Sequence, residues 1–85
     1  MPVVFRRDGL RYYFFSNEGL PPEPAHIHVK GGGKDAKIWL VPEIAIADAY
    51  GFNRRELSAI VSAVAENRDL ILRAWYDHFG HQRPL

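Results

Sequence analysis

The first fifteen residues contain two runs of mainly apolar side chains, which predict two short β-strands whose successive side chains point to opposite faces. Residues 3–7 and 10–15 are rich in β-branched and aromatic side chains, and only Asp8-Gly9 separates the two runs. Asp-Gly between such runs is typical of a type I′ turn, so we expect a hairpin whose register pairs residues outward as far as Val4 with Tyr13. The face directed toward the core then carries Val3, Phe5, Leu10, Tyr12 and Phe14.

Alternation with a period of two continues through the middle of the chain. It predicts strands at 26–30 and 36–41, separated by a Gly-rich turn at 31–35, and a short fifth strand at 43–47. The residues of these strands that are directed toward the core are Ile27, Val29, Ala36, Ile38 and Leu40. The opposite face of the sheet collects basic, histidine and aromatic side chains, namely Arg6, Arg11, Tyr13, Phe15, His26, His28, Lys30, Lys37 and Trp39.

The pattern changes to helical spacing in the last third of the chain. Asn53 followed by Glu56 is the capping-box arrangement that begins a helix, and Asn67 is expected to cap a second one. The apolar stripe of the first helix is Leu57, Ile60, Val61 and Val64. The apolar side of the second helix is Leu70, Ile71, Ala74, Trp75, His78 and Phe79.

This order of elements predicts an α+β fold, in which an antiparallel sheet precedes two helices that pack on one of its faces. Four strands are expected with a fifth at 43–47. The expected organisation is one domain over residues 1–85, with the sheet within 2–47 and the helices at 53–66 and 68–79.

Composition narrows the class of protein. The chain has 85 residues and no cysteine, which excludes disulfides and thiolate metal sites. Its 11 basic and 10 acidic residues give a net charge of +1, which argues against a strongly basic nucleic-acid-binding domain. The first residues lack the pattern of a signal peptide, and no apolar run is long enough to span a bilayer. We therefore expect a cytoplasmic protein that does not enter a membrane.

The pair His26-x-His28 carries the most suggestive chemistry. Alternate residues of a strand project to the same face, so these imidazoles can share a divalent metal with the carboxylate of Glu18. His78 and His81 are the other candidate ligands. In a catalytic interpretation, His28 is the general base and His26 or Glu18 a ligand or acid. The structural alternative gives both histidines only hydrogen bonds to their neighbours, with no cofactor.

Several short segments occur in a recognisable order: Ser16–Gly19, Pro22–Val29, Ala36–Pro42, Gly51-Phe52 and Leu72–Trp75. Over residues 2–80 the chain resembles the bacterial and archaeal family called domain of unknown function 4160. The Pro-rich loop before His-x-His-Val is the most specific element, although Ala25 stands where many members have Pro. The polar and aromatic motif positions fall here on Asn17, Glu18, His26, His28, Lys37 and Trp39.

The resemblance points to no particular enzymatic activity, because none is established for that family. Family genes often lie beside a gene for another small uncharacterised domain, and the pair is discussed as a toxin–antitoxin module. The leading hypothesis is therefore a non-catalytic protein-interaction module and toxin–antitoxin candidate, which binds the protein encoded next door or a second copy of itself. The expected binding residues are Lys37, Trp39, Asn17, Tyr13, Arg11 and Lys30, beside His26 and His28.

Two alternatives belong to other functional classes. One is a small metal- or His-dependent hydrolase or nuclease, in which Lys37 stabilises an anionic transition state. The other is binding of RNA or single-stranded DNA, with aromatic side chains stacking on bases and lysine or arginine holding phosphates.

Overall fold

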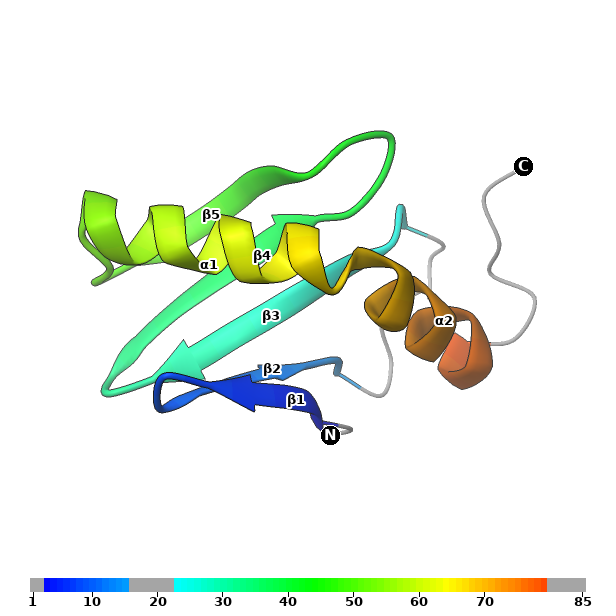
Figure 1. Ribbon diagram of the computed structural model, residues 1–85, viewed down its shortest axis with the longest axis horizontal. Coiled ribbons are helices and arrows are strands. Elements are labelled where there is room, and N and C mark those ends of the chain that lie inside the picture. Colours follow the sequence, from blue (N-terminus) through cyan, green and yellow to red (C-terminus); the bar gives the residue numbers. More distant parts are fainter. Residues whose placement is uncertain (1–2, 16–22, 80–85) are drawn as a thin grey trace.

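The structure is a computed structural model that describes residues 3–15 and 23–79. An antiparallel sheet, whose strands lie side by side in chain order, is followed by two helices (Figure 1). The strands are β1 (Val3–Arg7), β2 (Leu10–Tyr13), β3 (His26–Gly31), β4 (Lys34–Trp39) and β5 (Ala45–Tyr50). The helices are α1 (Arg54–Glu66) and α2 (Arg68–Phe79). The α+β fold expected from the sequence is confirmed, and the fifth strand is present.

Two tight turns connect the strands that the sequence predicts most clearly. Asp8 and Gly9 have φ angles of 55° and 79°, as a type I′ turn requires. Gly32 and Gly33 have φ angles of 59° and 76°, so two residues suffice between β3 and β4. The turn predicted at 31–35 is therefore too long, because its outer residues continue the strand pairing.

The register of the first hairpin departs from the prediction at its open end. Phe5 pairs with Tyr12 as expected, but Val3, rather than Val4, pairs with Tyr13. The irregularity lies between Val3 and Phe5, where one extra residue in β1 makes a β-bulge. As a result Val4 packs against the core, while Val3 is 41% exposed and is not the core residue that strict alternation predicts.

The fifth strand also lies further along the chain than predicted. The sequence pattern places it at 43–47, whereas β5 spans Ala45–Tyr50. Pairing with β4 sets these limits, because Ala45 lies opposite Trp39 and Tyr50 lies opposite Asp35. All six residues of β5 are exposed, as is common for a strand at the edge of a sheet.

The core lies between the sheet and the helices. Its fully buried side chains come from alternate sheet positions and from one stripe of each helix: Tyr12, Phe14, Ile27, Val29, Ile38, Leu40, Ile60, Val64, Ile71 and Trp75. Helix α1 runs along the sheet, and α2 lies beyond the end where β2 finishes and β3 begins (Figure 1). Two members of the predicted apolar side of α2 are instead exposed. Leu70 is 46% exposed, and His78 stacks on Phe14 with its ring centroid 6.3 Å away.

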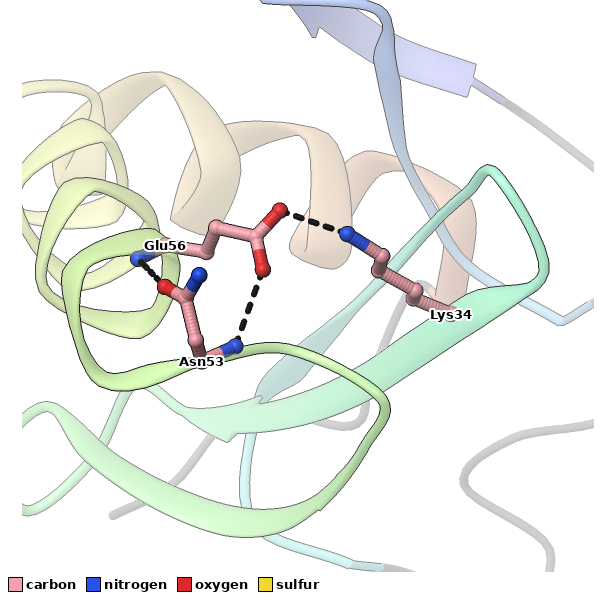
Figure 2. Close-up of polar contacts among 3 residues, drawn as sticks. All are labelled: Lys34, Asn53 and Glu56. Carbon is pink, nitrogen blue, oxygen red and sulfur yellow. Dashed lines mark hydrogen bonds and ion pairs between the residues drawn. The ribbon is translucent and has the colours of Figure 1, made fainter.

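The start of α1 is fixed by the predicted capping box, which a lysine from the sheet extends (Figure 2). The Oδ1 of Asn53 accepts from the backbone N–H of Glu56 at 2.8 Å, and Oε1 of Glu56 accepts from the backbone N–H of Asn53 at 2.9 Å. The Nζ of Lys34 donates to Oε2 of Glu56 at 2.7 Å. This last hydrogen bond is the main cause that lowers the pKa of the Glu56 carboxyl below its ordinary value of 4.5.

Asn67 serves the junction between the helices in a different way from the one predicted. Asn67 is the C-cap of α1. Its side-chain Nδ2 donates back to the carbonyl oxygen of Ala63 at 2.8 Å. Its own carbonyl oxygen accepts from the N–H of Ile71 at 2.9 Å, which begins the hydrogen bonding of α2. One residue therefore ends one helix and starts the next, and Asp69 lies in the first turn of α2 as expected.

Candidate binding groove on the open face

Alternation places a second set of side chains on the sheet face opposite the helices, here called the open face. One row across it is Tyr13, His28, Lys37 and Asp48, each aligned with its neighbour on the next strand. The adjacent row is Arg6, Arg11, Lys30, Asp35 and Tyr50. The structure thus brings together the predicted binding residues Tyr13, Arg11, Lys30 and Lys37 on one surface.

A groove of about 320 Å³ lies along these rows. Its lining residues are Tyr13, Phe15, His28, Lys30, Asp35, Ala36, Lys37 and Asp48. The aromatic part is compact. The ring of His28 stacks on Tyr13 with centroids 5.6 Å apart and meets the edge of Phe15 at 4.6 Å. Tyr13 is 5% exposed, whereas Phe15 is 40% exposed and leaves apolar surface open at the groove.

Lys37 stands at the junction between the groove and Trp39. Its Nζ lies 4.4 Å from the centroid of the Trp39 ring and 3.2 Å from Oε1 of Glu23. The cation–π contact and the ion pair hold the ammonium group over the indole. Lys37 therefore links the groove to Trp39, which itself lines a second hollow together with Pro24 and Pro42.

His26 belongs to the open face by alternation, but its side chain is fully buried. Its Nδ1 lies 2.9 Å from the carbonyl oxygen of Pro24, and since a carbonyl only accepts, Nδ1 donates. Its ring packs against Trp39 of β4 and against Trp75 of α2, with centroids 5.4 and 4.9 Å away. Because α2 reaches the end of the sheet here, the ring is enclosed by aromatic side chains, and its polar nitrogen has an acceptor, as buried polar groups need.

The two histidines of the predicted metal site lie close together with different surroundings. Their ring centroids are 5.2 Å apart and their planes are inclined by 84°. Within residues 3–15 and 23–79, no three His, Asp or Glu side chains gather in a way that could hold a metal. Glu18, the predicted third ligand, lies outside the described residues, as do Asn17 and His81. The site composed of His26, His28 and Glu18 therefore stays a prediction.

Sequence reasoning missed the acidic residues around the groove. Asp35 was assigned to the turn and Asp48 fell beyond the predicted fifth strand, yet both line the groove. The sequence does contain a signal that places Asp35 on β4. The two glycines after Gly31 are enough for a tight turn, so the strand can begin before Asp35. The contact of His26 with Trp75 had no such local signal, since it depends on where α2 packs.

Comparison with known proteins identifies the family. The model of the family described as "Domain of unknown function (DUF4160)" matches residues 9–76, which include strands β2 to β5, the residues that line the groove, helix α1 and most of helix α2. The chain belongs to the DUF4160 family. No curated protein and no solved structure matches it. Among its described residues, the two helices are too short and too polar to cross a membrane.

Proposed function

We propose that this DUF4160 protein is a cytoplasmic, non-catalytic protein-interaction module that binds a partner polypeptide through the open face. The observation that carries the proposal is the groove, in which an aromatic cluster lies among lysine and aspartate side chains. The hydrophobic core lies on the other face of the sheet, so packing in the core does not account for the charged and aromatic residues in this place. Aromatic side chains are enriched at protein interfaces, and the rim of an interface is polar.

The charges around the groove favour a polypeptide as the occupant. Lys30 lies opposite Asp35 and Lys37 opposite Asp48, so cations alternate with carboxylates across the strands. A polypeptide presents donors, acceptors and charges of both signs, and it can match such a surface. The surface left exposed by Phe15 would contact an apolar side chain of that partner.

The family supports a partner that is encoded beside this chain. Family resemblance implies neighbouring genes for two small proteins, which are discussed as a toxin–antitoxin pair. A groove on a small domain fits one half of such a pair, in which the activity of one protein is controlled by its binding to the other. We therefore propose this chain as a component of a two-protein module of that kind.

A hydrolase or nuclease is the second candidate function, and one observation favours it. His28 lies in the groove beside Lys37 on the next strand, which puts a titratable base near a cation. The burial of His26 supports the non-catalytic proposal. A substrate cannot reach its ring, which is fully buried against two tryptophans. Metal analysis of untagged protein, with RNA and DNA incubated beside it, separates the two candidates. Bound metal together with cleaved nucleic acid would favour the enzyme.

Co-purification with the product of the adjacent gene tests the interaction proposal. Phe15→Asp places a charge at the edge of the groove and is expected to abolish the complex. Leu70→Asp is a matched control, since Leu70 is similarly exposed but lies on α2. Mass measurement in solution shows whether a second copy of the chain is the partner instead. Absence of a complex with either the neighbour or a second copy at micromolar concentration, or equal loss in both variants, would contradict the proposal.

A further inference from the structure

Three cations lie side by side at one end of the open face. Arg6 pairs with Arg11 across β1 and β2, and Arg11 pairs with Lys30 across β2 and β3. All three side chains are exposed. Because neighbouring strands are about 4.8 Å apart, the row extends over roughly 10 Å. We call these three residues the cationic row.

The cationic row differs from the other cations of the sheet in its partners. Arg7 forms an ion pair with Glu66 on α1, and Lys34 forms one with Glu56. On the open face, Lys37 has Glu23. Within the part of the chain that the structure describes, no member of the cationic row takes part in an ion pair. Asp35, next to Lys30 across the strands, is the nearest acidic position in that row.

Like charges directly opposite each other on adjacent strands destabilise a sheet. Two such pairs follow one another here, Arg6 with Arg11 and Arg11 with Lys30. These two like-charge pairs oppose folding, whereas an anionic partner would relieve the repulsion as it binds. Lys30 also lines the groove, so the cationic row and the groove form one continuous surface.

We infer that the partner contacts this surface through an acidic segment, whose carboxylates lie over the cationic row while an apolar side chain enters the groove beside Phe15. The inference rests on the proposed function, and it specifies the chemistry of the partner. Arginine suits this role because its planar guanidinium can bind a carboxylate through two hydrogen bonds.

The same surface fits a nucleic acid less well. Beyond Lys30 the row continues with Asp35, and beyond Lys37 with Asp48. A phosphate backbone that extended past the cationic row would meet these carboxylates, whereas a polypeptide can place a lysine, an amide or an apolar residue against them. The cationic row is also short, and the chain as a whole carries a net charge of only +1.

Fluorescence polarisation with defined probes tests the inference. The probes are a short labelled peptide with Glu at alternate positions between Ala and Phe, its counterpart with Gln in place of Glu, and a labelled oligothymidylate. The double variant Arg11→Gln, Lys30→Gln removes two charges from the cationic row. The matched control Arg54→Gln, Arg73→Gln removes two exposed charges from the helices.

The Glu peptide is expected to bind the wild type and the control equally, and to bind the row variant about tenfold more weakly. Binding should also weaken at about 1 M salt, where the Debye length falls to about 3 Å. The inference is overturned if the Gln peptide binds as tightly as the Glu peptide, if both double variants lose the same affinity, or if no peptide binds. Tighter binding of the oligothymidylate would overturn it in favour of a nucleic acid.

The row variant also separates this inference from the proposed function. If the product of the adjacent gene still co-purifies with Arg11→Gln, Lys30→Gln but not with Phe15→Asp, the open face is the interaction surface and the acidic segment is wrong. If neither variant affects that complex, the proposed interaction surface itself is wrong. Loss of the complex in both variants, with the Leu70→Asp control intact, supports both.

Discussion

The two faces of the sheet carry different kinds of side chain on the same strands. Across β2, β3 and β4, one row is Tyr12, Val29 and Ala36, all buried against the helices. The next row, one residue along each strand, is Tyr13, His28 and Lys37, which line a groove. The first row contains what a core requires, and the second contains charges and aromatic rings that a core does not. This difference supports the proposal that the open face binds a partner.

His26 shows that alternation alone does not separate the two faces. It shares the parity of His28, yet it is fully buried because Trp75 of α2 covers the end of the sheet. Its hydrogen bond to Pro24 and its contacts with two tryptophans link the sheet, the loop before β3 and the second helix. The pair His26-x-His28 is therefore divided between a structural position and a position in the groove.

Truncating one apolar residue on each face is the strongest way to test the comparison. Ile38 is fully buried between the sheet and the helices, so Ile38→Ala should lower the free energy of unfolding by about 2–5 kcal/mol. Phe15→Ala on the open face should cost about 1 kcal/mol, since this ring is 40% exposed. Urea denaturation followed by circular dichroism measures both. Equal losses would contradict the division of the sheet into a folding face and a binding face.

The sequence predicts those features of the fold that depend on residues close together in the chain. Asp8-Gly9 determines its turn through residues that are adjacent in the chain, and Asn53 with Glu56 determines the start of α1 in the same way. The core and open faces of β3 and β4 also follow from alternation, except at His26. Exposure of Val3 could not be predicted, because a bulge in β1 depends on the pairing of two strands rather than on the composition of one.

The sequence predicts only part of the candidate site, because some of its residues are positioned by contacts between distant segments. Alternation placed Tyr13, His28, Lys30 and Lys37 on one face, and the structure brings them together around the groove. Asp48 was missed because the limits of β5 follow from its pairing with β4, and the local apolar pattern marks an earlier segment. The burial of His26 was missed because it depends on a helix that is distant in the sequence.

A second prediction concerns the ion pair that joins the sheet to α1. Lys34 lowers the pKa of the Glu56 carboxyl, so the ionised form stabilises the native state above the ordinary pKa of 4.5. This contribution is lost as the pH falls through the lowered pKa of the folded state. Glu56→Gln keeps a side-chain acceptor for the N–H of Asn53 but lacks the charge, so it should be less stable than the wild type near pH 7. The difference should shrink as the pH falls below 4.5.

Denaturation of both proteins over this range measures the effect, with Glu43→Gln as the control. Glu43 is exposed and lies outside the capping box, so its substitution should change stability only slightly. A Glu56→Gln difference that does not change with pH would show that the ion pair contributes nothing. Lys34 pairs with Glu56, and Arg7 pairs with Glu66. These two cations of the sheet therefore have carboxylate partners on α1, in contrast to the cationic row.

The smallest expected effect has the opposite sign and concerns the cationic row. Arg11→Glu places a carboxylate directly between Arg6 and Lys30, replacing two like-charge pairs with two opposite-charge pairs. Each exposed cross-strand pair contributes a few tenths of a kcal/mol, so the variant should be more stable than the wild type by about 0.5 kcal/mol at low salt. The gain should decline as salt screens the charges.

The same substitution is expected to abolish binding of the Glu peptide, because it inverts the charge at the centre of the cationic row. Stability and binding would then change in opposite directions at one position, as happens where a surface keeps an unfavourable arrangement for its function. Arg54→Glu on the helix side is the control, and it should leave peptide binding unchanged. If Arg11→Glu instead destabilised the fold, the native arginine would contribute to folding. The division of the sheet into a folding face and a binding face would then be wrong.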